Sequence, residues 1–420
     1  MCLLFQPGPV AGAVLFMVIS CPSRFDRAII HDMKIAPFET EHFFARYEFN
    51  TPYQLCNSDC ESISIEELLS LSGDSLENFG QERLIYTESQ GNPDLRAGIA
   101  NTYSDVSEQD IVVLGTPVEG IYLAARTLLD PGDEVIVLSP AYDALTTMFE
   151  HVAGASAVKR WCFRPGEDSW ELDLDELRAL ISPKTKLLVV NFPHNPTGYL
   201  PGPDFQRTLL GLAEEHGFHV FCDEMYFGLV QPGTEPLPSA ADVSRQAIVL
   251  SGLSKTYGLP GLRCGWLVIR DRELLEQFMN WKFYTSICPP GPVEYLATAA
   301  LRVWETLRDR NIARISRNLA VADDFFERWP GEFTWRRPRA GSTALIGWDV
   351  PSVEKISHEL ATREGILVQS ARMLGGDDQH MRFGFGRDNF PEALSRFEDW
   401  LKRNSAAGMA DRLDQYGQGW

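Results

Sequence analysis

The middle of the chain alternates between short apolar runs and stretches with helical spacing. The apolar runs lie at residues 111–114, 134–138, 187–191, 219–223, 247–250 and 265–269. A strand covered by helices on both faces is apolar along its whole length, whereas a half-exposed strand alternates apolar with polar residues. We therefore predict an α/β fold with a mainly parallel sheet between helices. One of these helices is predicted at 119–129, with Pro117 near its start.

A second, smaller domain is predicted outside this region. Residues 298–404 mix helical spacing with the strand-like pieces TALIGW and MRFGFG, which suggests an α+β domain completed by residues 34–75. Residues 76–297 then form the large domain. Residues 1–33 are expected to be a disordered extension, and residues 405–420 a tail of turn-like composition.

The apolar run at residues 10–19 is too short to span a bilayer. No Lys or Arg precedes it, so the charged start of a signal peptide is missing. We expect no stable membrane insertion. A weak anchor is the alternative, and Met33 is an alternative start of the protein.

Charge and composition exclude several classes of function. The formal net charge of −20 makes nucleic acid an unfavourable partner, because like charges repel. The eight cysteines have no metal-site spacing and are expected to be reduced thiols in a cytoplasmic protein. The sequence contains no phosphate-binding Walker loop, and its eight histidines form no cluster with metal-ligand spacing, so no metal site is predicted.

Polar residues follow three of the predicted strands. Open α/β sheets bind ligands at the carboxyl ends of their strands, so these residues are candidates for a site. Asn195 lies in a rigid Pro-rich turn, Asp223 ends an apolar strand, and Lys255 is followed by glycines and then by Arg263. Taken singly, each has a simpler interpretation. Asn195 would belong to a structural turn, Asp223 would cap a helix, and Lys255 would be a solvated lysine.

Together these motifs resemble the class I/II aminotransferase family of fold type I pyridoxal-phosphate (PLP) enzymes. The resemblance covers residues 83–387 and is carried by the Asn-Pro-Thr-Gly turn and by the run Ser-Lys-x-x-Gly-Leu-x-Gly-x-Arg-x-Gly-Trp that starts at Ser254. It implies a large domain with a seven-stranded sheet, a smaller α+β domain, and pyridoxal 5'-phosphate as the cofactor.

The resemblance also implies roles for the catalytic residues. Lys255 would form the Schiff base with the cofactor, and Asp223 would pair with the pyridinium nitrogen, which keeps the ring protonated. Tyr226 and Asn195 would bond the 3′-oxygen of the cofactor. Arg263 would anchor its phosphate.

Further residues match binding positions of the family. Tyr142 would stack on the cofactor ring, with core packing as the alternative. Tyr86 would reach the phosphate of a neighbouring subunit, which implies a homodimer. Arg382 would grip the substrate carboxylate with help from Asn191, although Arg387 is near enough in sequence to be confused with it.

Two departures from the family pattern affect the phosphate site, which Ser254 is also expected to line. The loop before the helix reads Thr116-Pro117-Val118, and Pro117 offers no N–H donor. The Thr116 hydroxyl and the Val118 N–H remain available. A serine is common three positions before the lysine, where this chain has Gly252.

The implied reaction is transfer of an amino group between an L-amino acid and a 2-oxo acid, with Lys255 moving the substrate Cα proton. The alternative is a lyase or cyclase of the capreomycidine-synthase type acting at Cβ or Cγ, which the stretches 192–200 and 57–61 resemble. A non-catalytic sensor would carry a basic DNA-binding segment, and the sequence shows no candidate for one. Phe43, Phe44 and Tyr47 are expected either to line the substrate site or to pack in the small-domain core.

Overall fold

The computed structural model describes residues 35–404. The predictions for residues 1–33 and 405–420 concern segments that lie outside these residues. Residues 38–404 belong to one compact unit, so the boundary between a large and a small domain stays a prediction. Within the described part, no helix is both long and apolar enough to cross a membrane.

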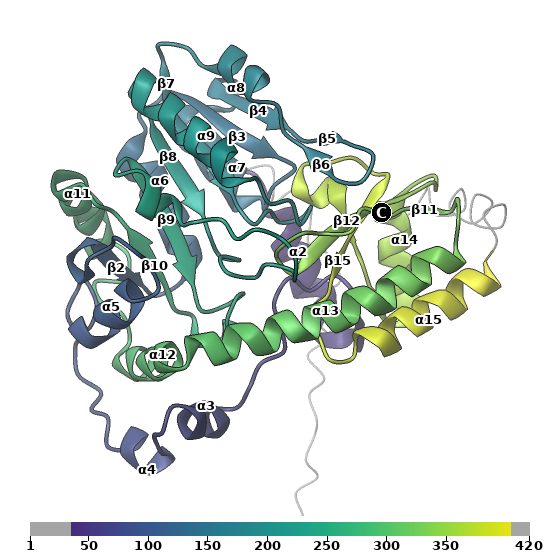
Figure 1. Cartoon of the computed structure of the whole chain (residues 1–420), viewed down its shortest axis with the longest axis horizontal. Coiled ribbons are helices and arrows are strands. Elements are labelled where there is room, and N and C mark those ends of the chain that lie inside the picture. Colours follow the sequence, from purple (N-terminus) through teal and green to yellow (C-terminus); the bar gives the residue numbers. More distant parts are fainter. Residues whose placement is uncertain (1–34, 405–420) are drawn as a thin grey trace, which may run out of the picture. The chain divides into compact units, whose positions relative to one another are not determined.

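A seven-stranded sheet forms the centre of the fold (Figure 1), which confirms the predicted fold class. Its order is β2 (Ile111–Leu114), β10 (Gly265–Val268), β9 (Ala247–Gly252), β8 (His219–Asp223), β7 (Thr185–Asn191), β3 (Glu134–Ser139) and β4 (Val158–Cys162). The pairs from β9 to β4 are parallel, whereas β10 runs antiparallel to both of its neighbours.

Alternate side chains of each strand enter two different cores, as the period of two along a strand requires. In β2, Val112 and Leu114 pack with α6 (Pro117–Leu128), α7 (Ala144–Ala153) and α11 (Arg272–Phe283). Ile111 and Val113 pack on the opposite face with α5 (Pro93–Ala100), α9 (Pro203–His216) and α12 (Gly291–Arg302). The sheet is therefore buried on both sides.

A four-stranded sheet with its own core lies toward the C-terminal end. Its order is β11 (Phe333–Thr334), β12 (Thr343–Trp348), β15 (His380–Gly384) and β14 (Gln369–Ser370). The long helix α13 (Trp304–Arg328) packs against α15 (Phe390–Arg403), and both appear beside β12 and β15 in Figure 1. The predicted strand-like pieces TALIGW and MRFGFG are thus β12 and β15.

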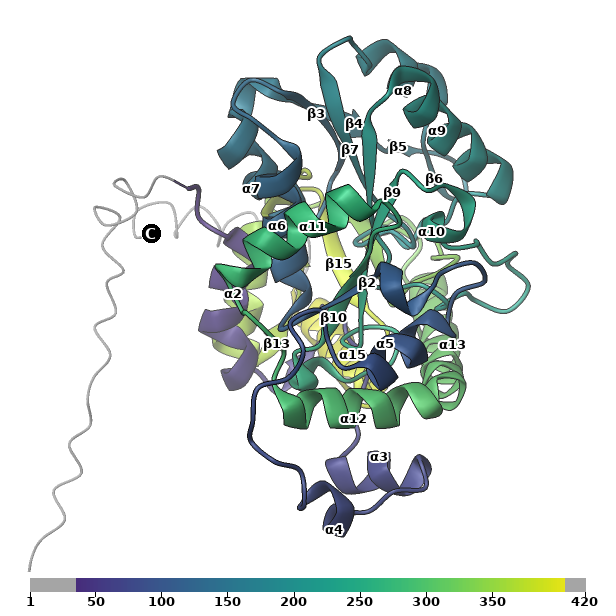
Figure 2. The ribbon, with the colours of Figure 1, turned by 90° about the vertical axis from the view of Figure 1, so that its left-hand side faces the viewer.

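The remaining elements are short. They are α2 (Glu39–Tyr47), α3 (Ile65–Leu71), α4 (Leu76–Phe79), α8 (Leu174–Leu180), α10 (Ala240–Val243), α14 (Val353–Glu359), the pair β1 (Tyr53–Gln54) and β13 (Ile366–Leu367), and the pair β5 (Arg164–Pro165) and β6 (Trp170–Glu171). The α3 helix packs on α12, and both lie in the lower part of Figure 2. Between β1 and α3 runs the segment Leu55–Glu61, which crosses to the end of β15.

Candidate active site

The carboxyl ends of six strands meet at one edge of the large sheet. The start of β10 lies there as well, because this strand runs in the opposite direction. A cavity of about 490 Å³ opens at this edge. Its wall holds most of the predicted site residues, namely Lys255, Asp223, Tyr226, Tyr142, Asn191, Asn195, Pro117, Val118, Ser254, Arg263 and Arg382.

Lys255 lies partly buried in the cavity, and its amine faces the N-terminal segment. Its Nζ donates a hydrogen bond to Ser58 Oγ at 2.8 Å. Burial lowers the pKa of Lys255, because removal from water disfavours the ammonium form. Asp59 opposes this shift and Arg382 adds to it. A lysine with a lowered pKa reaches its neutral, nucleophilic form more readily.

Asp223 stands at the end of β8 with its side chain buried. Its Oδ1 accepts a hydrogen bond from Met225 N at 3.0 Å. Burial raises the pKa of Asp223 to about 6, although this bond and the more distant charge of Lys255 lower it. Among residues 35–404, no ion pair joins this carboxylate to a cation. A buried carboxylate is costly unless a cation pairs with it, so this environment suits a positively charged partner.

The turn after β7 is fixed by Asn191. The Asn191 side chain donates to Asp223 O and accepts from Asn195 N, both at 2.8 Å. These bonds fix the position of Asn195 in the cavity wall. His194 in the same turn contacts Thr197 Oγ1 at 2.7 Å and Pro140 O at 3.0 Å. Burial lowers the pKa of His194 to about 3, so it is neutral and structural.

Arg382 and Arg387 have different surroundings. Arg382 is buried, lines the cavity, and donates to Cys56 O and to Asn195 Oδ1. Arg387 does not line this cavity and instead pairs with Asp59 at 2.8 Å and Glu61 at 3.7 Å. Of these two arginines, only Arg382 lines the cavity, and its role toward a substrate carboxylate stays a prediction.

The opposite end of the cavity is suited to an anion. Arg263 Nη2 donates to Thr116 Oγ1 at 2.6 Å, which brings Thr116 beside the cavity although it does not line it. Thr116 is also the N-cap of α6, so the positive end of this helix dipole lies beside the same part of the cavity as Arg263. Ser254 Oγ is buried there without a hydrogen-bond partner.

These observations fit PLP at both ends of the cofactor. A phosphate beside Arg263 would accept a hydrogen bond from the Ser254 hydroxyl, which has no other partner. A protonated pyridine ring would supply the cation that Asp223 lacks. Lys255 lines the same cavity, and among the described residues its amine forms no ion pair that would block condensation with an aldehyde.

The two departures from the family pattern are in contact with each other. A Cβ placed on Gly252 would lie 3.1 Å from Pro117 Cγ and 2.9 Å from Cys264 O. A Cβ on Gly265 would lie 2.8 Å from Pro117 Cγ. The Pro117 ring therefore packs directly on the backbone of β9 and β10, and Gly252 is the residue that leaves room for it.

Gly252→Ser is expected to destabilise the protein by about 1–3 kcal/mol, the usual cost of overpacking. Adding Pro117→Ala should recover part of the loss, because the proline contact disappears while the Cys264 contact remains. Urea unfolding of the single and double variants measures both effects. A Gly252→Ser protein of unchanged stability and tighter PLP binding would contradict this interpretation.

Two predicted site residues do not line the cavity. Thr116 is bonded to Arg263 in its wall, whereas Tyr86 forms no hydrogen bond to a wall residue within residues 35–404. The Tyr86 side chain is 86% exposed. It lies in the stretch before α5, on a surface rich in exposed apolar side chains. A residue expected to act in a neighbouring subunit has to be exposed in the single chain, so its role stays a prediction.

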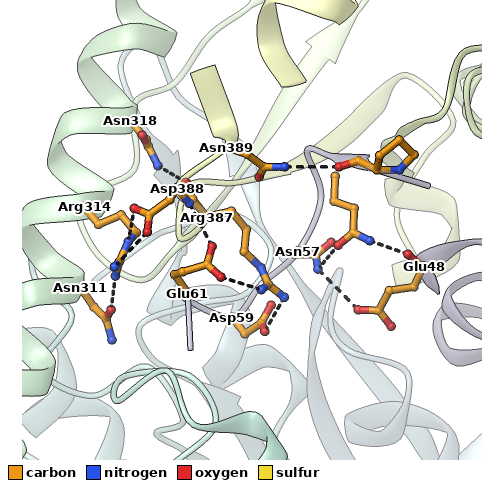
Figure 3. Close-up of polar contacts among 12 residues, drawn as sticks. Glu48, Asn57, Asp59, Glu61, Asn311, Arg314, Asn318, Arg387, Asp388 and Asn389 are labelled. Atoms are coloured by element: carbon orange, nitrogen blue, oxygen red, sulfur yellow. Dashed lines mark hydrogen bonds and ion pairs between the residues drawn. The ribbon is translucent and has the colours of Figure 1, made fainter. Parts of the chain in front are cut away.

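The sequence predicts aromatic residues of the N-terminal segment as candidates for the site but not the polar residues that this segment contributes. Glu41, Glu48, Asn57, Ser58 and Asp59 all line the cavity. Figure 3 shows part of this wall, with Asp59 paired to Arg387 and Glu48 next to Asn57. The run Asn-Ser-Asp-Cys-Glu at 57–61 enters the sequence analysis only as a resemblance to the capreomycidine-synthase branch. The polar side chains of this run, within a stretch that is otherwise buried, were the signal in the sequence that could have placed it at the site.

Three aromatic residues of α2 divide between the two predicted locations. Phe44 lines the cavity, and the guanidinium of Arg382 lies 5.8 Å from the centre of its ring. Phe43 and Tyr47 are buried in a separate core with Leu367. Within the described residues, no group of His, Cys, Asp and Glu side chains is arranged to hold a metal ion.

Comparison with known proteins decides the family. The family model described as "Aminotransferase class I and II" matches residues 62–396. The chain belongs to this family. Family membership implies PLP, and the chain is a PLP-dependent enzyme of the aminotransferase family.

The relatives of this aminotransferase-family enzyme include different activities. Capreomycidine synthase of Streptomyces vinaceus is 30% identical over 80% of this chain and 86% of its own. An aspartate aminotransferase of Thermotoga maritima is 28% identical over 75% and 83%. A PLP-dependent aminotransferase structure from Streptococcus suis superposes with a TM-score of 0.81 at 28% identity, covering 88% of this chain and 99% of its own. The structure of the PLP-dependent cyclase OrfR has the same TM-score at 26% identity, with coverage of 87% and 97%.

Proposed function

We propose that the protein is a PLP-dependent aminotransferase that transfers an amino group between an L-amino acid and a 2-oxo acid. The observation that carries this proposal is the presence of Lys255, Asp223 and Arg382 in the wall of one cavity. These are the groups needed to attach the cofactor, to hold its ring charge, and to orient the carboxylate of an amino acid.

The chain's own residues then have distinct tasks. Bound PLP supplies an electron-withdrawing ring that weakens the Cα–H bond of an attached amino acid. Asp223 would hold the ring proton, and Tyr142 and Asn195 would orient the ring. Arg382 would fix the substrate carboxylate. The neutral amine of Lys255 would take the Cα proton of the substrate.

A panel of amino acids added to the yellow, PLP-loaded protein tests the proposal. We expect at least one amino acid to remove the visible absorption band, and a 2-oxo acid to restore it in a second half-reaction. Product formation that proceeds without any 2-oxo acid would contradict transamination and support a lyase or cyclase.

We further propose a homodimer in which Tyr86 reaches the neighbouring site. Several exposed apolar side chains support this surface as an interface: Leu84, Ile85, Tyr86, Phe283, Tyr284 and Ile287. The two segments that carry them are joined where Thr87 donates to Pro289 O at 2.8 Å. Burial of such a patch against a second copy would remove apolar surface from water.

Tyr86→Phe is expected to weaken PLP binding about 10-fold, because one hydrogen bond to a charged phosphate is lost. Equilibrium dialysis measures the PLP affinity, and sedimentation measures the assembly. Tyr284→Phe is the matched control, since Tyr284 is 82% exposed on the same surface and should not alter PLP affinity. A monomer with full PLP affinity would contradict both the dimer and the role of Tyr86.

A lyase or cyclase of the capreomycidine-synthase type is the second candidate, and the acidic wall of the cavity favours it. Asp59 is neutralised by Arg387, and Glu41 accepts a bond from the Tyr142 hydroxyl at 2.8 Å. The Glu48 carboxylate has no ion-pair partner among residues 35–404, and its hydrogen bond comes from Asn57 Nδ2 at 3.4 Å (Figure 3). Burial and repulsion by Asp59 raise the pKa of Glu48.

Asn57 supplies a second unused acceptor at the same place. Its Nδ2 is directed to Gln54 Oε1 at 2.7 Å, which leaves Oδ1 buried without a partner. A carboxylate and a carbonyl with free lone pairs suit a donor-rich cation such as a guanidinium. A guanidine nitrogen is also an internal nucleophile, which ring closure at Cβ or Cγ requires.

Glu48→Gln is therefore expected to weaken binding of L-arginine about 10-fold while leaving L-norleucine unchanged, since only the cation loses its partner. Spectral titration of the PLP-loaded protein with both amino acids gives the two affinities. Glu61→Gln is the control, because Glu61 lies on the same segment outside the cavity. Equal weakening for both amino acids would exclude recognition of charge.

We propose a cytoplasmic location because the described cysteines carry free thiols. The described cysteines Cys56, Cys60, Cys162, Cys222, Cys264 and Cys288 are all free. Free thiols suit a reducing compartment.

A further inference from the structure

We propose that Ser58 is the positioning residue for Lys255, and that its hydroxyl holds the lysine in the ammonium form produced by proton abstraction. The inference rests on the proposed PLP chemistry and adds a residue to it. Its basis is the 2.8 Å hydrogen bond from Lys255 Nζ to Ser58 Oγ, which joins residues 197 positions apart in the sequence.

Ser58 is held in place from several directions. Leu55 O accepts from Gly384 N at 2.7 Å, and Glu61 N donates to Gly386 O at 2.8 Å. Between these two bonds, Ser58 O accepts from Ser342 Oγ at 2.6 Å. The hydroxyl of Ser58 is therefore presented to Lys255 by a segment fixed to β15, and not by a free loop.

The small size of Gly384 makes this arrangement possible. A Cβ on Gly384 would lie 1.6 Å from Asn57 O, and one on Gly386 would lie 2.3 Å from Asp59 O. No side chain fits at either position without moving the segment. Ser58 lies between these two contacts, so its distance to Lys255 is set by backbone packing.

The direction of the hydrogen bond determines what Ser58 does. Its oxygen accepts from Nζ, and an acceptor favours the charged form of an amine. During proton abstraction the substrate Cα–H bond breaks, the proton moves to Nζ, and the electron pair stays with the substrate. Lys255 then carries the positive charge that Ser58 stabilises, so the hydroxyl lowers the energy of the product of that step.

Other charged and titratable groups also act on this amine and are common to every variant below. They are Asp59, Glu41, Arg382 and Cys60, together with Glu48 and Asp223, whose own pKa values respond to Lys255, and Tyr226, whose side chain is hydrogen-bonded to Ser58. Replacing Ser58 by Ala removes its bonds to Lys255 and to Tyr226 and leaves the side chains of all these groups in place. The effect of its hydroxyl on Lys255 is therefore measured with the same charged groups present.

The experiment follows recombination of the PLP-free full-length protein with PLP across a range of pH. The rate at which the visible aldimine band appears depends on the fraction of Lys255 that is neutral, and requires no knowledge of the substrate. Ser58→Ala should shift the midpoint of this pH profile downward by about one unit, because the ammonium form loses an acceptor. Ser58→Gly should shift it equally.

Two further variants separate this role from a purely structural one. Ser58→Thr keeps the hydroxyl and should restore the original midpoint. Ser342→Ala loosens the segment while keeping the Ser58 hydroxyl, and should leave the midpoint in place. An unchanged midpoint in both Ser58→Ala and Ser58→Gly would overturn the inference, even though the band still forms. Absence of the band in every variant, the native protein included, would instead overturn the proposed PLP attachment and this inference with it.

Discussion

Lys255→Met is expected to abolish covalent attachment of PLP and to lower the rate of amino-group transfer by at least about 10⁴-fold. The upper range for loss of one acid–base group is of this order, and this variant also loses the attachment point of the cofactor. Borohydride reduction followed by peptide mapping should place the cofactor on Lys255 in the native protein and on no peptide of the variant.

Lys282 offers a matched control for this experiment. Its side chain is also buried, and burial lowers its pKa in the same direction. Its Nζ, however, donates to Ser286 Oγ at 3.0 Å, and it does not line the cavity. Lys282→Met should keep the label on Lys255. A native protein labelled at Lys282 would overturn the assignment of the site.

Asp223→Asn is expected to have opposite effects on the PLP-free and the PLP-loaded protein. Burial raises the pKa of Asp223 from 3.8 to about 6. A carboxyl whose pKa is higher in the folded than in the unfolded state contributes its full stability below about pH 4, and that contribution is lost as pH rises to about 6. The difference in pKa corresponds to about 3 kcal/mol in the PLP-free protein.

The asparagine variant carries no such charge, so its PLP-free form should be the more stable one at pH 7–8, and its unfolding free energy should vary less between pH 4 and 6. In the PLP-loaded protein the same change removes the partner of the ring cation. Breaking a buried ion pair costs about 3–5 kcal/mol, so the rate of amino-group transfer should fall about 10²–10⁴-fold. Urea unfolding with and without PLP, together with steady-state kinetics, measures both effects. A PLP-free variant less stable than the native protein at pH 8 would contradict the account.

The core strands of the large sheet were predictable because burial on both faces leaves a continuous apolar run. Strands β2, β7, β8 and β9 lie where the sequence placed them, within a few residues at their ends. Strand β4 was missed because it is an edge strand with the mixed sequence VKRWC, of which only Trp161 is fully buried. The antiparallel direction of β10 has no sequence signature, since it depends on the path of the chain between strands.

The candidate site was predictable where a strand end fixes the position of a residue. Lys255, Asp223 and Asn195 each follow such a strand, and the family motif supplied their expected roles. Ser58 and Glu48 follow no strand of the large sheet, and they reach the cavity through contacts across the sequence. The 197 residues between Ser58 and Lys255 illustrate why a local pattern could not reveal that contact.

The close approach of Gly384 to the Asn57 backbone has a consequence for how this fold can change. Arg382 lies two residues before this glycine on β15, and it also donates to Cys56 O at 2.8 Å. The arginine that would receive a carboxylate and the serine that contacts the lysine are therefore parts of one rigid block. Any rotation of β15 that repositions one of them carries the other along, so a new substrate preference is more easily acquired through Glu41 and Glu48 than through remodelling of this block.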